Sequence, residues 1–517
     1  MTQDISTLLS EPLTNDLKKN IEQVESILVD NSDLVKREIS FEAHIEMKGV
    51  CLYIDGLANS DTIDTAIETL IYKASKASEE VGIQTANGML PDYLKTHVLF
   101  NQIVKIVDNF QNLLDELLGG TAVILLEQSD RALILASKGW NERSIEQPQS
   151  EQVVRGPRDG FTENLRNNTS LVRRRIRTPY FSVKSMKVGH KTKTDVAVAY
   201  IRETVKEGLV EEVVSRIENI KIDGVLDSGY IEEMITDNPF SPFTTVQSTE
   251  RPDKVSAALL EGKAAIFVDN SPFVLIVPSY FWEFLQASDD YYSNYISGSF
   301  YRFVRLTALV ISLTLPSLYV LLVSFHQEMI PTTLALTIAS GREVVPFPVL
   351  LEALIMEIAF ELIREGGLRM PKPIGQAVSI VGSLIIGQAA VQAGILSPFM
   401  VIVVALTGIA SFAIPNYAAS FSIRLVRFPL LIASGTLGLL GFAAVFTILA
   451  VHAISLRSFG EAYLAPAIPF QPSDQKDSFL RFPWWAMKRQ PHLAEGSENR
   501  SAQEGQIPRP NRKQKEK

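Results

Sequence analysis

The 517-residue sequence predicts an α+β/α-helical membrane protein: an N-terminal cytosolic α/β region of two related subdomains, then a C-terminal bundle of four to six transmembrane helices. One reason is charge. Only 12 of the 151 residues from Leu306 to Leu456 are charged, about 8%, against 21% for the whole chain. The second reason is a repeated order of strands and helices before Leu306. Because the first 20 residues contain no apolar run of signal-peptide length, we expect the α/β region to remain cytosolic.

The first subdomain is predicted to span residues 1–145. Apolar residues at helical spacing predict an amphipathic helix within Asn15–Leu28. A short strand, Val50–Gly56, ends in an Asp-Gly turn and leads into a helix over Thr62–Ala74. Two apolar runs around a polar turn then predict a β-hairpin over Thr121–Leu135.

The second subdomain, 146–285, repeats this order. Asn168–Ile176 matches Asn31–Ile39 at five of nine positions, and Ala197–Ile217 resembles the earlier strand and helix. A second hairpin is predicted over Ala264–Val277. The offsets between the paired segments differ only by loop-sized insertions, which favours two related subdomains in tandem. The alternative is chance similarity, because short matches of this kind are common in α/β proteins.

Residues 286–305 are predicted to form an aromatic collar at the membrane interface. Ten aromatic residues lie between Tyr280 and Phe303, and Arg302 and Arg305 end the segment. Aromatic rings with polar tips, followed by basic residues, are typical of the headgroup layer. The alternative is a helix from the core of a soluble domain.

The transmembrane region is predicted to cover residues 306–457. Leu306–Phe325 is one charge-free span, Pro373–Ile423 is long enough for two spans with a turn near Leu396–Pro398, and Phe428–Leu456 supplies another. Small residues at every fourth position predict a helix-packing edge: Gly375, Ser379, Ser383 and Gly387. Gln388 and Gln392 either bond across helices or line a water-filled path.

The segment Leu350–Pro371 is unusual because Glu352, Glu357 and Glu361 interrupt an apolar run. A charge at the bilayer centre costs at least about 2.5 kcal/mol, so these carboxylates should not face lipid. The basic residues at the helix ends and in the tail, 458–517, place both termini in the cytosol, which requires an even number of crossings. Counting this segment gives five. It is therefore either re-entrant or interfacial, or it crosses with its acidic face toward water. The three glutamates, Gln388 and Gln392 are pore-lining candidates; the alternative is an amphipathic helix packed on other subunits.

The sequence favours no enzyme, metal or cofactor. It contains no phosphate loop, nucleophile elbow or metal-spaced histidines, and its single cysteine, Cys51, cannot form an internal disulfide. The net charge of −9 argues against nucleic acid as a partner. A basic run within Arg155–Pro179 either contacts phosphates, anionic lipid or acidic partners, or forms a solvated face with intersubunit ion pairs. Its contact candidates are Arg155, Arg173, Arg174 and Arg175.

Several segments together resemble the A subunits of the GerA family of spore germinant receptors. They are Lys138–Ile176, Asp237–Val255, the second hairpin with its collar, Val345–Lys372 and Ser458–Phe470. The resemblance runs from near residue 13 to about residue 491, and the polar sequence beyond it is typical of a disordered tail.

The resemblance implies a multi-pass protein of the spore inner membrane with a cytosolic N-terminal region. Its partners would be a transporter-like, nutrient-binding B subunit and a C lipoprotein. It also implies a homo-oligomer, a pentamer, that forms an ion channel and triggers ion release and germination. Two alternatives stay open: a non-conducting membrane scaffold, and a paralogue associated with the dipicolinate-release system.

Overall fold

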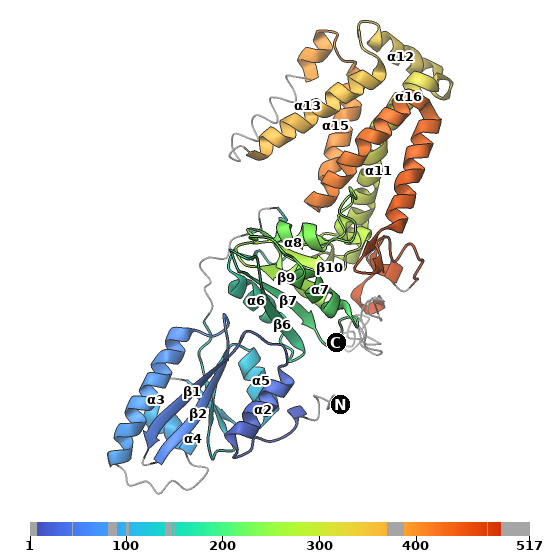
Figure 1. The fold of residues 1–517 in the computed structure, drawn as a ribbon. Helices are drawn as coiled ribbons and strands as arrows, with labels where there is room; N and C mark the ends of the chain where they lie inside the picture. The colour runs from blue at the N-terminus through green and yellow to red at the C-terminus, as the bar shows by residue number, and fades with distance from the viewer. Residues whose placement is uncertain are drawn as a thin grey trace, which may run out of the picture.

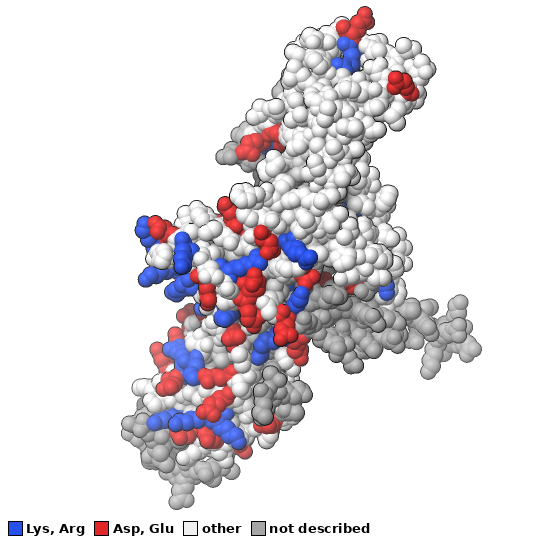
Figure 2. All heavy atoms as spheres, turned by 45° about the vertical axis from the view of Figure 1, so that its right-hand side comes forward, with Lys and Arg blue, Asp and Glu red and all other residues white. Residues whose placement is uncertain are grey.

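The computed structural model describes residues 8–43, 45–80, 90–99, 103–139, 147–148, 150–369, 387–472 and 474–487. Two α/β subdomains and a helical region follow one another along a long axis (Figure 1). On the face drawn in Figure 2, charged side chains cover the subdomains and are sparse on the helical region. The charge contrast of the sequence is therefore also a contrast between two parts of the folded chain.

Subdomain 1 is an antiparallel five-stranded sheet with helices on both faces. Its elements are α2 (Leu17–Ile27), β1 (Leu34–Ala43), β2 (Ile45–Ile54), α3 (Ser60–Glu80), α4 (Leu90–Tyr93), β3 (Val104–Val107), α5 (Phe110–Leu118), β4 (Ala122–Leu126) and β5 (Ala132–Leu135). Alternate residues of β2 point to opposite faces: Cys51 and Tyr53 pack with α3, whereas Leu52 and Ile54 pack with α2 and α5. Strand β2 is therefore covered on both sides.

Subdomain 2 has the same arrangement, and the predicted hairpin is β9–β10. Its elements are α6 (Leu165–Arg173), β6 (Phe181–Val188), β7 (Thr194–Ile201), α7 (Leu209–Glu218), α8 (Ser228–Ile235), β8 (Gln247–Thr249), α9 (Pro252–Leu260), β9 (Ala264–Val268) and β10 (Val274–Val277). The strand order is β6-β7-β9-β10-β8, which corresponds position by position to β1-β2-β4-β5-β3. Two structurally equivalent subdomains thus stand where the sequence predicts a tandem repeat.

One of the matches that suggested this repeat is wrong. Asn31–Ile39 leads into strand β1, whereas most of Asn168–Ile176 lies in helix α6. The equivalent of α6 is α2. In both helices an asparagine side chain makes hydrogen bonds to the backbone of a threonine six residues earlier. Asn20 accepts a hydrogen bond from the Thr14 backbone N at 2.9 Å and donates to the Thr14 carbonyl at 2.6 Å. Asn168 makes the same two bonds to Thr162, at 2.8 and 2.6 Å.

The helical region begins with α10 (Asp289–Tyr292) and α11 (Tyr295–Phe325). The predicted collar is therefore divided between a short helix and the first turns of α11. Next come α12 (Thr332–Arg342), α13 (Val349–Arg369), α15 (Pro398–Phe412) and α16 (Tyr417–Ser455). The chain then returns to subdomain 2 through β11 (Arg457–Ser458) and β12 (Glu461–Ala462), and ends in the 3-10 helices η5 (Asp474–Asp477) and η6 (Trp484–Ala486).

Helix α16 folds back on itself at Gly438. This residue has φ 62° and ψ −139°, a left-handed backbone that suits glycine. Leu456, directly after the helix, packs in one cluster with Ala419 and Ile423 near its start, so the two ends lie together. The single span expected over Phe428–Leu456 is consequently broken at Gly438. Residues 428–437 end the first arm of an antiparallel pair, and the residues after Gly438 form the second arm, as Figure 1 shows.

Among the described residues, two helices, α11 and α16, are long and apolar enough to cross a membrane. The turn expected at Leu396–Pro398 is present, because α15 begins at Pro398 with Ser397 as its N-cap. Gly375, Ser379 and Ser383, three of the four predicted packing residues, lie outside the described residues.

Candidate functional site: buried charges of the helical region and the junction below it

Three of the four glutamates of helix α13 turn toward neighbouring helices. Glu352 is fully buried, and its Oε1 accepts hydrogen bonds from the Ser397 backbone N and Oγ, both at 2.6 Å. Arg342 Nη2 lies 3.6 Å from its other oxygen. Since Ser397 caps α15, the carboxylate sits where the positive end of the α15 dipole favours a negative charge. Glu352 therefore joins the start of α13 to the start of α15.

Glu357 and Glu361 pair with two arginines of α16. Arg427 Nη2 lies 2.8 Å from Glu357 Oε2 and 3.5 Å from Glu361 Oε1, and Arg424 donates to Glu361 Oε2 at 2.6 Å. The side chains of Glu357 and Arg427 are each 1% exposed, while Glu361 is 28% exposed. The Arg427–Glu357 contact is an ion pair without hydrogen-bond geometry. Two carboxylates and two guanidinium groups thus form a compact, charge-balanced layer between α13 and α16.

Arg364, one turn beyond Glu361, lies beside this layer. Its Nη2 donates to Ser411 Oγ of α15 at 2.6 Å, and its guanidinium stacks over the rings of Phe412 and Phe360, 4.4 and 5.1 Å from their centroids. A cavity of about 340 Å³ opens beside the layer, with Glu361, Arg364 and Arg424 in its wall. Of the predicted glutamates, only Glu361 reaches open space.

Neither sequence expectation for this segment included charge partners within the chain. Helix α13 is a helix of 21 residues, and two glutamates of its acidic face meet arginines of α16. Sequence reasoning missed Arg424 and Arg427 because they lie more than 60 residues from the glutamates. A signal existed, since these two arginines are the only charged residues from 373 to 456. Isolated charges in an apolar stretch usually pair inside a helix bundle.

The other residues predicted for this region lie elsewhere. Gln388 and Gln392 are exposed and belong to a helical stretch, 387–392, that precedes α15. Gly387 is buried, and a Cβ placed on it would lie 3.5 Å from Val401 of α15, which fits a packing role. The structure does not bring the glutamines to the glutamate layer within one chain.

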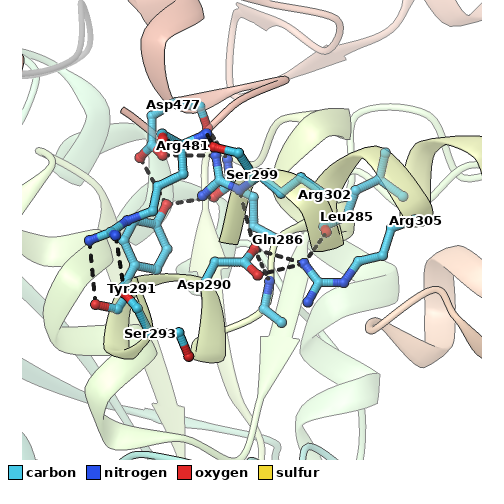
Figure 3. Close-up of polar contacts among 11 residues, drawn as sticks. Leu285, Gln286, Asp290, Tyr291, Ser293, Ser299, Arg302, Arg305, Asp477 and Arg481 are labelled. Atoms are coloured by element: carbon cyan, nitrogen blue, oxygen red, sulfur yellow. Dashed lines mark hydrogen bonds and ion pairs between the residues drawn. The ribbon is translucent and has the colours of Figure 1, made fainter. Parts of the chain in front are cut away.

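A second polar cluster lies at the junction between subdomain 2 and the helical region (Figure 3). Asp290 of α10 is fully buried and points between two arginines of α11. Arg305 Nη1 donates to both of its oxygens, at 2.7 and 2.9 Å, and Arg302 Nε donates at 3.2 Å. The arginines that sequence reasoning placed in the lipid headgroup layer are thus turned into the protein.

The C-terminal segment completes this junction. Arg302 also pairs with Asp477, at 2.8 Å, and Tyr291 donates its hydroxyl to the same carboxylate at 2.8 Å. Burial raises the pKa of Asp477 and raises the pKa of Tyr291 well above its ordinary value. Arg481 donates to the backbone carbonyls of Ser293 and Tyr291. The base of α11 is therefore held from both sides, by the end of subdomain 2 and by residues almost 200 positions later.

The arginine candidates of the basic run have mainly internal roles. Arg173 is 1% exposed and pairs with Asp33 of subdomain 1, so it has no free surface for lipid or another chain. Arg175 donates to both oxygens of Asp159, at 2.8 and 2.6 Å. Arg174 is partly exposed, and Arg155 is exposed, with its backbone N bonded to Asp289 Oδ1.

Apolar helices with inward-paired charges, joined to two α/β subdomains, are typical of a membrane-associated protein with a large extramembrane region. Comparison with known proteins agrees. A sequence model described as "Bacillus/Clostridium GerA spore germination protein" matches residues 22–493. The chain belongs to the GerA family of spore germination proteins, and the recognition from sequence is confirmed.

Two relatives from Bacillus subtilis illustrate the similarity. The chain is 44% identical to spore germination protein KA, over 96% of this chain and 89% of that protein. It is 38% identical to spore germination protein B1, over 94% of this chain and 99% of that protein. Among solved structures, the N-terminal domain of the A subunit of the Bacillus megaterium germinant receptor GerK3 matches 53% of this chain and 98% of its own, with 30% identity and a TM-score of 0.42.

Proposed function

We propose that this chain is the channel-forming A subunit of a nutrient germinant receptor, and that it releases ions to start spore germination. Membership of a family of spore germination proteins supports the receptor role. The observation that carries the channel role is the pairing of Glu357 and Glu361 with Arg424 and Arg427 inside an apolar helical region. Charges in such a place are costly and typically mark an ion pathway.

In this conformation the layer is neutral, which corresponds to a closed channel. Each carboxylate has a guanidinium partner within 2.8 Å, so neither attracts a passing cation strongly. Moving α13 away from α16 would separate the pairs at the wall of the open cavity. Glu361 would be freed first, since it is already partly exposed. Acidic groups that line a water-filled path select cations over anions.

Assembly of several chains would place several copies of α13 around one axis. The outward face of α13 is an apolar stripe, available to lipid or to a neighbouring copy: Leu351, Ile355, Ile358 and Leu362. The proposed assembly is a pentamer in the spore inner membrane, with a nutrient-binding B subunit and a C lipoprotein as partners. In that assembly Gln388 and Gln392, both exposed, are free to line the path or contact the next chain.

Liposomes that contain the purified chain, with and without its partner subunits, test this proposal. We expect K⁺ efflux that exceeds Cl⁻ efflux, and we expect Glu361→Gln to lower that preference. Glu343→Gln, at an exposed glutamate beyond the end of α12, is the matched control. Monomeric protein in detergent, or oligomers with no cation flux, would contradict the channel role.

A non-conducting scaffold is the second candidate, and the burial of the Glu357–Arg427 ion pair favours it, because buried pairs also hold helices together. The two candidates differ in one measurement. If Glu361→Gln and Arg424→Gln leave ion release from germinating spores unchanged while receptor assembly persists, the pairs serve assembly alone.

A further inference from the structure

The last described segment of the chain, residues 479–485, exposes large apolar side chains although it belongs to the predicted cytosolic tail. Leu480, Phe482 and Trp484 are 48%, 40% and 52% exposed. Exposed apolar residues that lie together mark a contact surface, because isolated ones are normal but clusters are not.

Hydrogen bonds and ring contacts fix the position of this segment along α11. Ser299 donates its hydroxyl to the Arg481 carbonyl at 2.9 Å, and the Arg481 N lies 3.2 Å from the same hydroxyl. Trp485 packs edge-on against Tyr295, with ring centroids 5.8 Å apart. A Cβ placed on Gly298 would lie 3.3 Å from the Arg481 side chain, so the backbone approaches closely. The segment is therefore docked on the first two turns of α11, as Figure 1 shows in red.

These first turns lie directly below the charge-free stretch of α11. At about 1.5 Å per residue, the 20 residues from Leu306 to Phe325 extend about 30 Å, the thickness of the hydrocarbon core. Ser299 lies seven residues before this stretch, about 10 Å below the core edge if α11 is upright and nearer if it tilts. Residues docked on Ser299 are thus at the level of the headgroup layer.

The exposed surface of α11 also supports a position of its first turns in the headgroup layer. Arg302 and Arg305 are the only charged residues of α11, and both turn inward to Asp290. The outward face is accordingly apolar from the first turn onward: Ile296, Phe300 and Phe303 are 61–62% exposed. Leu480, Phe482 and Trp484 add exposed apolar side chains in the segment that contacts these first turns. Tryptophan and phenylalanine beside a spanning helix are typical of the interface.

We propose that residues 479–485 lie in the cytosol-facing headgroup layer of the membrane. This segment, which we call the strap, would then hold the base of α11 through non-covalent contact with lipid. The proposal rests on the membrane location given under the proposed function. The strap also carries Arg481 into the junction and begins two residues after Asp477, so its contact with lipid would hold the junction closed.

A fluorescent label at a single cysteine tests this in the full chain. In a Cys51→Ala background, which removes the one native cysteine, Phe482→Cys is labelled with an environment-sensitive dye and reconstituted in phosphatidylcholine vesicles. The fluorescence quencher is attached to the lipid headgroup, attached to the middle of the lipid acyl chain, or dissolved in the buffer as iodide. Ile448→Cys on α16, 66% exposed, reports the membrane core, and Tyr72→Cys on α3, 71% exposed, reports the solvent.

We expect the label at position 482 to lose most fluorescence to the headgroup quencher and less to the other two. Strong quenching by iodide, as at position 72, would place the segment in water and overturn the proposal. Protection from all three quenchers would mean that protein covers the segment, which also overturns it. If the lipid quenchers do not reach the label at position 448, the proposed membrane location is contradicted. If they reach position 448 but not position 482, only the proposed location of the strap is contradicted.

Discussion

Arg173 and Asp33 form a buried ion pair that joins the two subdomains. Arg173 Nε lies 2.5 Å from Asp33 Oδ2, and Nη2 lies 2.7 Å from Oδ1. Asn31 accepts a further hydrogen bond from Nη2, and Tyr200 of subdomain 2 donates its hydroxyl to Asp30 at 3.0 Å. The loop before β1 is therefore linked to subdomain 2 by several polar contacts.

Asp33→Ala is expected to lower stability strongly, because it leaves the Arg173 guanidinium buried without its charge partner. Removing one member of a buried pair typically costs about 3–5 kcal/mol. The measurement is urea unfolding followed by tryptophan fluorescence. Glu25→Ala is the control, since the Lys36–Glu25 pair is 42% and 48% exposed and such pairs contribute about 1 kcal/mol or less. Equal losses in the two variants would contradict a special role for the buried pair.

The two asparagines of α2 and α6 predict a second pair of matched variants. Asn20 and Asn168 are each 1% exposed. Replacing either one by alanine removes the side-chain partner of a threonine N–H and carbonyl just before α2 or α6. Unsatisfied buried groups cost about 1–3 kcal/mol. We expect similar losses of unfolding free energy in both variants, each in its own subdomain. A large loss in one and none in the other would argue against equivalent structural roles.

Local patterns of the sequence predict much of this fold, whereas contacts between residues far apart in the sequence are not predicted by them. The hairpins over Thr121–Leu135 and Ala264–Val277 are found because a strand pair and its turn are contiguous. The match of Asn31–Ile39 with Asn168–Ile176 fails because a few shared apolar and basic residues suit a strand as well as a helix. Thr14–Asn20 and Thr162–Asn168 share fewer apolar residues, but their hydrogen bonds identify the true equivalence.

The candidate site shows the same limit. The helical nature of the glutamate segment and its apolar outward stripe follow from 100° periodicity. Its partners, Arg424 and Arg427, depend on how α16 packs, which no local pattern encodes. The fold-back at Gly438 also lies in an uninterrupted apolar run, where neither a charge nor a proline marks a turn.

Glu261, at the end of α9 near the junction, predicts a pH dependence. Burial is the largest cause that raises the pKa of this carboxyl from 4.5 to about 8, against the opposing effect of Lys263. A raised folded-state pKa means that the folded protein holds the proton more tightly than the unfolded chain. The stabilisation is therefore complete below about pH 4.5 and is lost as the pH rises toward 8.

Glu261→Gln should flatten this part of the stability profile. We expect the melting temperature of the native protein to fall between pH 5 and pH 8 more steeply than that of the variant, measured by thermal unfolding in detergent. Glu218→Gln, at an exposed glutamate that ends α7, should follow the native profile. Parallel curves for Glu261→Gln and the native protein would show that another group dominates.

The Glu357–Arg427 pair predicts strong coupling between two variants. Glu357→Leu leaves Arg427 with only the 3.5 Å contact to Glu361, and Arg427→Met leaves Glu357 with no cation within 4 Å among the described residues. Each single change should cost about 3–5 kcal/mol, seen as a lower melting temperature in detergent. The double variant should recover most of the loss, since apolar replacement of a complete buried pair is often neutral. Additive losses would show that the two side chains act separately. A stable double variant also separates packing from conduction: if it folds and assembles but loses cation flux, the charges serve the ion path and not merely the contact between α13 and α16.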